Sequence, residues 1–366
     1  MDRETYGFIG LGLIGGSMAR AIKKSRPDCR IIAYTPHRET VDTAKADGII
    51  DEPVYEIGAA FAGCDYIFLC APVELNNENL VKIAPYLSSK TTLTDIGSVK
   101  NSIHEKIKEL GLEGQFIGGH PMTGTERIGY KNSKAALLEN AYYILTKTET
   151  TDEERLQRYR DLVKDMGALP LIVPYMQHDY ITAAISHVPH VISASLVNLV
   201  KDNDSEDELM KTIAAGGFKD ITRISSSSPT MWQQICNTNS YNISELLGKY
   251  IDSLCDIKLA IDEHDSNKLF DFFASAREYR ESFMDIASGP IQKTYVLHVE
   301  IDDQPGRLAA VAVLLSEHSI NIKNIGIVHN REYERGTLRI ELHNRKGLEQ
   351  ALNVLSENGY NVAERK

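Results

Sequence analysis

Hydrophobic and polar positions change their period twice along this chain of 366 residues. In the first part, short apolar runs that are typical of buried strands alternate with stretches of helical period. The apolar runs lie at 6–10, 30–34, 66–70, 91–95, 115–118, 142–146 and 169–173, and the helical stretches include 14–24, 74–86 and 153–166. This alternation predicts a mostly parallel, doubly wound α/β sheet of the Rossmann type over residues 1–174.

The pattern becomes helical between residues 175 and 288. The stretch 180–200 is apolar around most of its circumference, whereas 239–261 and 266–286 are amphipathic. Pro189 should kink the first helix or open a local turn in it. We therefore expect an all-α second domain, whose first helix is buried in the domain or in the subunit interface of a homodimer.

A third pattern follows the predicted linker Ser288-Gly289-Pro290. It predicts strands at 294–301, 321–329, 336–343 and 360–363, and helices at 306–318 and 346–358. This βαββαβ order is typical of a ferredoxin-like module. We expect it to form a third domain over residues 294–366.

Composition narrows the class of protein. The formal net charge of −11 argues against a nucleic acid or an anionic membrane as partner. The five cysteines show no Cys-x-x-Cys spacing, so neither a disulfide framework nor a metal site is indicated. The N-terminus lacks the pattern of a signal peptide, and no apolar run approaches the roughly 20 residues that span a bilayer. These observations predict a soluble cytoplasmic protein.

The N-terminal glycines predict a dinucleotide site. The sequence GLGLIGGS at 10–17 follows the first strand and opens a helix, which is the context of a Gly-x-Gly-x-x-Gly fingerprint. Gly10 would make the tight turn, Gly12 would admit the pyrophosphate, and Gly15 would let the helix pack on the strand. The amides at the helix start, including those of Leu13 and Ile14, would hold the phosphates.

The choice between NAD and NADP stays open in the sequence. The second strand ends in Ala33-Tyr34-Thr35-Pro36-His37-Arg38, without the carboxylate that usually binds the ribose diol. Thr35 could bond the ribose, whereas His37 and Arg38 could receive a 2′-phosphate. NAD is our first choice, and NADP is not excluded.

Side chains at the ends of the later strands should line the same crevice, because ligands bind at the carboxyl ends of strands in such sheets. Pro72 follows the third strand, and Ser98 and Lys100 follow the fourth. We expect Ser98 and Lys100 near the nicotinamide. A helix-capping serine and a surface lysine are the alternatives.

The sequence GGHPMTGTE at 118–126 predicts a constrained loop that presents His120. Glycine permits close backbone approach, proline fixes the exit angle, and histidine can take or give a proton near neutral pH. Taken alone, the pattern favours a tight turn with a solvated histidine. The dinucleotide site and a cationic set later in the chain favour a catalytic base.

Five motifs together resemble a known family. They are GLGLIGGS at 10–17, DIGSVK at 95–100, GGHPMTGTE at 118–126, SHVPH at 186–190 and GGFKDITR at 216–223. In this order they resemble bacterial prephenate dehydrogenases of the tyrosine pathway that carry a fused C-terminal ACT domain. The resemblance implies NAD-dependent oxidative decarboxylation of prephenate to 4-hydroxyphenylpyruvate.

The resemblance also implies roles for individual residues. His120 would be the base at the C4 hydroxyl of prephenate, and Ser98 would orient it or bond the same hydroxyl. Arg223 would hold a substrate carboxylate. The pyruvyl end and the rest of the pocket would be lined by His190, Lys219, Gly216, Thr125, Glu126, Trp232 and His187.

Two other interpretations concern the histidines of the apolar helix. His187 could be a packing residue hydrogen-bonded to Asp179, about two turns earlier. His187 and His190 share a helix face and could bind a metal, but no third ligand stands at a suitable spacing. We expect no metal.

The last domain resembles the ACT fingerprint through DDQPGRL at 302–308 and SINIKNI at 319–325. The resemblance implies an amino-acid pocket, with Gly306, Leu308 and Asn324 as contacts and tyrosine as the effector. A purely architectural domain that pairs subunits is the alternative. For the whole chain, the alternatives are an arogenate or dual-substrate cyclohexadienyl dehydrogenase, a 3-hydroxyacid dehydrogenase and a non-catalytic amino-acid sensor.

Overall fold

A computed structural model describes residues 3–125, 127–285, 295–302, 304–328 and 336–364. They form two compact units, residues 1–274 and residues 275–366. The first unit contains the predicted sheet together with most of the predicted helical domain. The three domain boundaries drawn from the sequence, at 174, 288 and 294, stay predictions.

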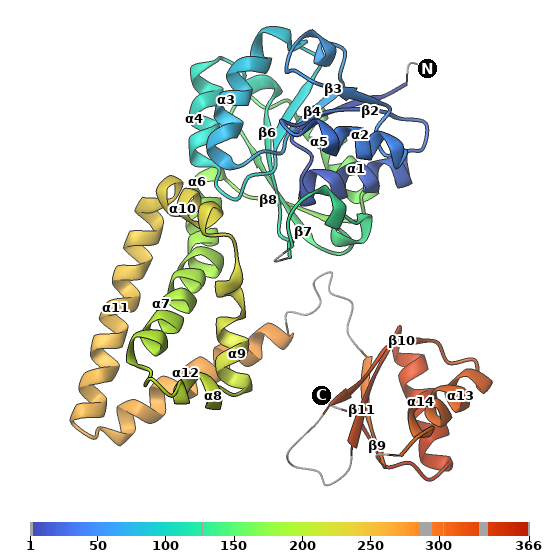
Figure 1. Ribbon diagram of the computed structural model, residues 1–366, viewed down its shortest axis with the longest axis vertical. Coiled ribbons are helices and arrows are strands. Elements are labelled where there is room, and N and C mark those ends of the chain that lie inside the picture. The colour runs from blue at the N-terminus through green and yellow to red at the C-terminus, as the bar shows by residue number, and fades with distance from the viewer. Residues whose placement is uncertain (1–2, 126, 286–294, 303, 329–335, 365–366) are drawn as a thin grey trace. The chain divides into compact units, whose positions relative to one another are not determined.

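A five-stranded parallel sheet begins the first unit (Figure 1). Its strands, in spatial order, are β3 (Glu52–Val54), β2 (Arg30–Tyr34), β1 (Thr5–Ile9), β4 (Tyr66–Leu69) and β5 (Thr92–Asp95). The first four apolar runs of the sequence are thus confirmed as strands, and β3 is an addition. The helices that follow these strands are α1 (Leu13–Ser25), α2 (Arg38–Ala46), α3 (Val73–Ile83) and α4 (Asn101–Glu109).

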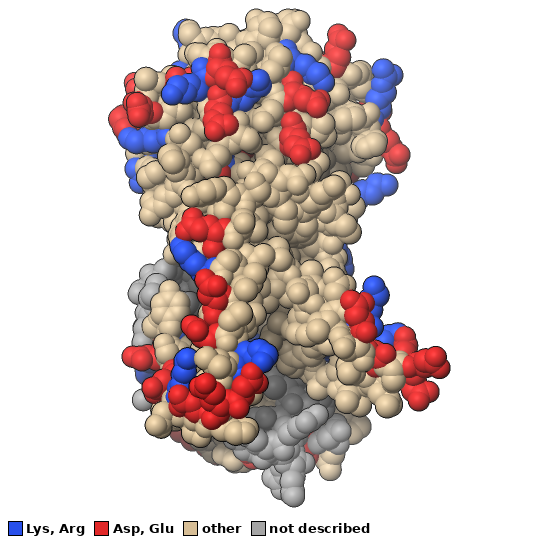
Figure 2. All heavy atoms as spheres, turned by 90° about the vertical axis from the view of Figure 1, so that its left-hand side faces the viewer, with Lys and Arg blue, Asp and Glu red and all other residues tan. Residues whose placement is uncertain are grey.

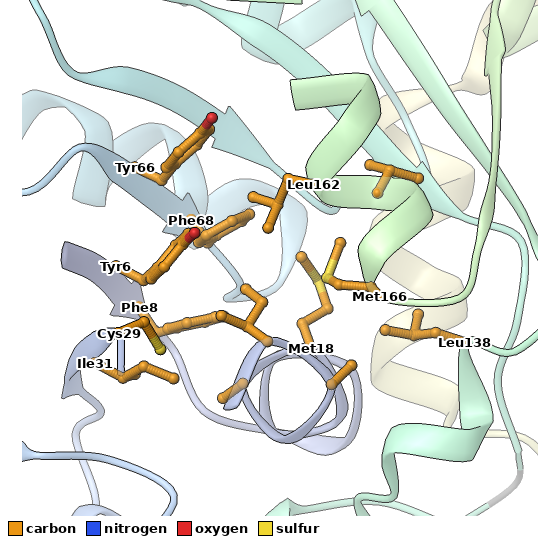
Figure 3. Close-up of a cluster of buried hydrophobic side chains, with 14 of the residues drawn as sticks. Tyr6, Phe8, Met18, Cys29, Ile31, Tyr66, Phe68, Leu138, Leu162 and Met166 are labelled. Atoms are coloured by element: carbon orange, nitrogen blue, oxygen red, sulfur yellow. The ribbon is translucent and has the colours of Figure 1, made fainter. Parts of the chain in front are cut away.

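Alternate strand residues supply two cores on opposite faces of this sheet, because successive side chains of a strand point to opposite sides. On one face, aromatic side chains from β1 and β4 stack and meet α1 and α5 (Glu153–Asp165). The ring centroids of Phe8 and Phe68 lie 4.8 Å apart, and Figure 3 shows Met18 and Leu162 closing over them. On the other face, Ile67 and Leu69 pack against α3 and α4. Helices on both faces confirm the doubly wound arrangement.

A second sheet, in the order β6-β7-β8, continues the first unit. Its strands are β6 (Ile117–Pro121), β7 (Tyr142–Lys147) and β8 (Leu169–Ile172). β6 runs antiparallel to β7, whereas β7 and β8 are parallel. A parallel bridge between Leu93 and Phe116 joins this part to β5. The sheet is therefore mostly parallel, as predicted, with one antiparallel pair.

Long helices complete the first unit, as the sequence predicts (Figure 1). A π-helical turn at Ala183–His187 ends two residues before Pro189 and confirms the predicted irregularity. The α-helices are α6 (Tyr175–Thr182), α7 (Val188–Asn203), α8 (Leu209–Ile213), α9 (Gly216–Thr222), α10 (Pro229–Thr238), α11 (Ser240–Asp262) and α12 (Ser266–Asp285), the last of which crosses the boundary between the units.

The helix formed by α6, the π turn and α7 corrects one expectation. From Tyr175 to Asn203 it has 29 residues and a mean hydropathy of 1.4 over its most apolar window, enough by length and composition to cross a membrane. No apolar run of this length was expected from the sequence. Its His178 and Asp179 are fully buried against polar groups of the α/β part, a contact that a lipid-embedded helix would lose. Only 22% of that window is buried in this chain, so much of its apolar surface is uncovered.

The second unit has the predicted βαββαβ order. Its elements are β9 (Tyr295–Ile301), α13 (Arg307–Glu317), β10 (Ile322–Val328), β11 (Gly336–Leu342), α14 (Arg345–Glu357) and β12 (Val362–Glu364). The strands form an antiparallel sheet in the order β10-β11-β9-β12. Apolar side chains from β9 and β11 pack with those of both helices into one core. The predicted linker at 288–290 lies outside the described residues.

Candidate active site

The glycine turn after β1 has the shape of a phosphate cradle. Gly10 has φ +101°, and a Cβ there would lie 2.7 Å from the carbonyl carbon of Cys70. A Cβ on Gly15 would lie 2.8 Å from the carbonyl oxygen of Gly10, so the helix start can approach the strand only without side chains. Gly12 caps α1, and a Cβ there would meet nothing within 4 Å. This open space beside the first amides of α1, including those of Leu13 and Ile14, fits a pyrophosphate.

The other predicted cofactor residues lie at the same sheet edge. Thr35 directly follows β2 and is 9% exposed, and Pro72 is the exposed cap of α3. His37 and Arg38 are exposed at the start of α2, where the Arg38 guanidinium lies over the Tyr55 ring. These positions fit a nucleotide ribose near Thr35.

His120 lies within β6, opposite Ile144, and not in a loop after the strand as the sequence suggested. The glycines before it are explained by close packing. A Cβ on Gly118 would lie 2.2 Å from Thr146 Oγ1, and one on Gly119 would lie 2.7 Å from the Asp95 carbonyl oxygen. Neither glycine needs a positive φ. The strand can therefore run close to β5, and it carries His120 to the edge where Asp95 ends that strand.

His120 contacts a second histidine from the helical part. Its Nδ1 lies 2.8 Å from Nε2 of His178, and Nδ1 of His178 lies 2.7 Å from Oδ1 of Asp179. The Asp179 carboxylate also accepts the backbone N–H groups of Lys100, at 2.7 Å, and Asn101, at 2.8 Å. Helix α6 is thereby bonded to the start of α4.

The surroundings keep His120 neutral near pH 7. Burial, followed by the nearby His178, Lys100 and His187, holds the pKa of His120 well below its usual range. Burial also lowers the pKa of His178, although its hydrogen bond to Asp179 acts in the opposite direction. A neutral imidazole can accept a proton, which is the property that a general base requires.

Lys100 is neither a surface residue nor exposed to the nicotinamide crevice. It is fully buried and forms an ion pair with Asp95, and burial lowers its pKa. Ser98, two residues earlier, is half-buried, and its hydroxyl makes no hydrogen bond within the described part of the chain. Ser98 was expected either to orient His120 or to bond the substrate hydroxyl. In the structure the hydrogen-bond partner of His120 is His178.

A second cluster surrounds Trp232 on α10. Its indole stacks on the ring of His190 with 3.7 Å between centroids, and the ring of His187 meets it edge-on at 6.0 Å. His187 is buried, its Nδ1 lies 3.1 Å from Nδ2 of Asn239, and burial lowers its pKa to about 4. The alternative that paired His187 with the Asp179 side chain is therefore wrong. Asn239 donates to the backbone oxygen of Asp179, at 2.8 Å, and so links both clusters.

The remaining predicted site residues that the structure describes are exposed. Arg223 follows α9 directly, is exposed, and is one of the charges that influence His190. Lys219 and Gly216 are exposed on α9, and no side-chain contact within the described residues joins them to Trp232. Thr125 is exposed and accepts the Arg127 N–H at 3.2 Å. Glu126 lies outside the described residues. The described residues contain no group of three or more His, Cys, Asp or Glu side chains that could hold a metal ion.

The sequence reasoning missed two residues of this site, His178 and Asn239. Both are buried and form hydrogen bonds between elements that are far apart in the chain. The adjacent His178-Asp179 pair does stand out as polar within an apolar helix, and this signal could have marked it. Asn239, at a helix start, has no comparable signal.

The second unit has a cavity of about 240 Å³ beside the start of α13. Gly306 caps this helix with φ +88°, and Leu308 is 40% exposed. Asn324 is exposed on β10, and its side chain accepts the Ile325 N–H. None of these three predicted contacts lines the cavity, although Arg307 does; the other lining residues are Glu300, Ile301, Asp302, Asn358, Gly359, Tyr360 and Asn361.

Sequence comparison places the chain among known proteins. Two family models match it. The model for the nucleotide-binding domain of prephenate dehydrogenase matches residues 18–171, and the model for the dimerization domain of prephenate dehydrogenase matches residues 175–275. Prephenate dehydrogenase of Bacillus subtilis is 34% identical over 360 residues, which are 97% of this chain and 97% of that protein. The chain belongs to the prephenate dehydrogenase family.

As a member of this family the chain is an enzyme, an oxidoreductase with a nucleotide-binding domain. The crystal structure of prephenate dehydrogenase from A. aeolicus in complex with hydroxyphenyl propionate and NAD+ has 30% identity and a TM-score of 0.72, covering 77% of this chain and 99% of that one. Synechocystis arogenate dehydrogenase has 29% identity and a TM-score of 0.68, covering 76% and 99%. The two family models end by residue 275, whereas the Bacillus subtilis relative matches nearly the full length.

Proposed function

We propose that this enzyme is an NAD-dependent prephenate dehydrogenase that converts prephenate to 4-hydroxyphenylpyruvate and carbon dioxide. The observation that carries the proposal is the position of His120, which is bonded to His178 at the sheet edge where the glycine turn opens. The relatives in Bacillus subtilis and A. aeolicus bear the name of this activity. The cofactor is NAD, as in the complex of the A. aeolicus enzyme with NAD+, and it supplies the hydride acceptor.

The chain's own residues then account for the proton and the substrate. His120 takes the proton of the C4 hydroxyl as hydride leaves C4, and the ring carboxylate departs as carbon dioxide while the ring becomes aromatic. Ser98, on the loop before α4, bonds the same hydroxyl. The guanidinium of Arg223 receives a substrate carboxylate, for which its planar fork is suited.

The rest of the pocket binds the pyruvyl end of the substrate. His190, His187 and Trp232 form one wall through their ring contacts. Trp232 Nε1 is buried without a hydrogen-bond partner in the described structure, so a substrate oxygen there would satisfy it. Lys219, Gly216, Thr125 and Glu126 complete the pocket in this proposal.

The test is turnover by the purified enzyme. Prephenate with NAD should give reduced nicotinamide absorbance and equimolar carbon dioxide, and the absence of turnover with both NAD and NADP contradicts the proposal. Arogenate is the second candidate substrate, because Synechocystis arogenate dehydrogenase has a similar structure. Comparing kcat/KM for the two substrates, and for NAD against NADP, decides between these alternatives.

The second unit is proposed to be an ACT domain through which tyrosine inhibits the enzyme. Its βαββαβ order and the cavity beside α13 support this role. An effector that acts from there must alter the active site through a definite coupling free energy. A chain truncated after Gly289 should keep prephenate turnover and lose tyrosine inhibition; equal inhibition of the truncated, folded enzyme would place tyrosine at the active site instead.

A homodimer is the proposed assembly, in the cytoplasm. The family model for residues 175–275 is described as a dimerization domain, and this region exposes large apolar side chains. Examples are Ile185 at 63%, Leu199 at 59% and Ile251 at 51% exposed. Figure 2 shows a part of the middle of one face that is free of charged side chains. Sedimentation of the purified enzyme should give twice the monomer mass.

A further inference from the structure

Three buried or half-buried side chains form a line that leads away from the proposed reaction site. They are His120 on β6, His178 on α6 and Asp179 beside it, joined by two hydrogen bonds of 2.8 Å and 2.7 Å. His178 and Asp179 are each 0% exposed. Because water does not reach them, the protons on this line are set by the partners within the protein.

The hydrogen bonds of His120, His178 and Asp179 are consistent with one arrangement of the imidazole protons. Asp179 accepts the N–H groups of Lys100 and Asn101, and a carboxylate that acts only as an acceptor requires His178 to donate from Nδ1. A neutral His178 then has its lone pair on Nε2, so Nδ1 of His120 must be the donor across their 2.8 Å contact. In a neutral His120 the other nitrogen, Nε2, is consequently unprotonated. The low pKa of both histidines, caused mainly by burial, agrees with the neutral forms.

We propose that His178 and Asp179 are positioning residues that hold His120 in the tautomer whose Nε2 can accept the substrate proton. The inference rests on the proposed function, in which His120 is the base at the C4 hydroxyl. After proton transfer, His120 carries N–H groups on both nitrogens and still donates from Nδ1 to His178. No proton needs to pass along the line, which acts by fixing the tautomer and the ring orientation.

Asp179 connects this line to the loop that carries Ser98. Its two oxygens accept the first amides around the start of α4, directly after Ser98 and Val99. Its backbone oxygen accepts from Asn239, so the main chain of α6 at this residue is also bonded to the start of α11 (Ser240–Asp262). One aspartate thus fixes the direction of His178 and the position of the loop that presents Ser98 relative to His120.

The tautomer can be measured directly in the full-length protein labelled with ¹⁵N-histidine. In a neutral imidazole the protonated and the unprotonated nitrogen give separate signals, and a His120→Asn variant assigns those of His120. We expect His120 to be protonated on Nδ1 near pH 7.5. A His120 protonated on Nε2 overturns the proposal, whether or not the enzyme turns over prephenate.

Two variants of His178 separate positioning from packing. His178→Gln keeps an acceptor for His120 and a donor for Asp179, whereas His178→Leu has a similar volume and neither group. We expect His178→Leu to lower kcat by about 10- to 100-fold, because a base contributes about 10²- to 10⁴-fold when it is correctly placed. KM for prephenate should change by less than about threefold, and His178→Gln should recover most of kcat and the wild-type tautomer.

His104→Gln is the matched control. His104 is another buried histidine beside α6, stacked on Tyr175 and bonded to Thr146, but outside the line from His120 to Asp179. This variant should keep kcat and the His120 signals even where it lowers stability. If His178→Leu also keeps kcat, or if His178→Gln is as impaired as His178→Leu while folded, the positioning role is refuted. Failure of the wild-type enzyme to turn over prephenate would refute the proposed function and leave the ¹⁵N result standing.

Discussion

The imidazole of His190 stacks on the indole of Trp232, with 3.7 Å between ring centroids and 26° between planes. The contact joins α7 to α10 and leaves the indole Nε1 buried without a hydrogen-bond partner within the described residues. A buried donor without a partner costs about 1–3 kcal/mol, so such atoms are usually satisfied by a ligand or by water. The stack therefore offers a rigid apolar wall with one donor for a substrate oxygen.

Replacing Trp232 by Phe should weaken substrate binding while leaving the chemical step intact. The phenyl ring keeps the contact with His190, but the N–H donor is lost. One hydrogen bond is worth about 0.5–1.5 kcal/mol, so we expect KM for prephenate to rise by about 3- to 10-fold with kcat within about twofold. Steady-state kinetics checks this, and an unchanged KM would show that the indole N–H does not face the substrate.

Replacing His120 by Asn should remove the base and preserve the fold. The Asn side chain has an amide that can donate to His178, but it cannot accept a proton near neutral pH. We expect kcat to fall by about 10²- to 10⁴-fold, with the thermal midpoint within a few degrees of wild type. A folded His120→Asn enzyme with undiminished kcat for prephenate would show that His120 is not the base.

Periodicity and glycine context predicted the fold well, because they report local preferences. Each strand run could be recognised from its own few residues, and the glycine turn from the residues that follow Gly10. The short edge strand at Glu52–Val54 has too few residues for a detectable period, and it forms because β2 offers it partners. Pro189 predicted an irregular helix, and the structure shows that the irregularity is a π turn.

The site was harder to predict, because its geometry depends on contacts between distant segments. His120 could be singled out by its motif, but its partner His178 is 58 residues away and on another element. Lys100 illustrates the opposite error. Its motif suggested a residue near the cofactor, yet the close approach of β5 and β6 leaves it buried against Asp95. Burial of this kind cannot be read from a strand-end motif.

Two glycine substitutions should have opposite consequences. Gly12→Ala places its methyl group in open space, so the protein should fold normally, but the methyl group lies where the pyrophosphate is expected. We expect KM for NAD to rise by about tenfold or more, with little change in the thermal midpoint. Gly119→Ala places the methyl group 2.7 Å from the Asp95 backbone and should lower stability by about 1–3 kcal/mol. A Gly12→Ala enzyme with wild-type KM for NAD would contradict the predicted cofactor position.

The buried histidines should make the first unit sensitive to acid. Burial lowers the pKa of His104 to about 3 and of His187 to about 4, and it also lowers those of His120 and His178. Their pKa values in the unfolded chain are about 6.5, so the unfolded state binds more protons below that pH. Stability should therefore be fully present above pH 6.5 and decrease as the pH falls toward 4.

His104→Gln isolates one part of this pH dependence. A single histidine whose pKa in the folded state lies far below 6.5 lowers the free energy of unfolding by about 1.4 kcal/mol for each pH unit below 6.5. Between pH 6.5 and pH 5 this amounts to about 2 kcal/mol. Urea unfolding can be followed through Trp232, the only tryptophan of the chain. Wild type should lose about 2 kcal/mol more than His104→Gln between pH 7 and pH 5. Equal losses in the two proteins would mean that His104 becomes protonated without unfolding, and therefore that its contacts with Thr146 and Tyr175 open in the native state.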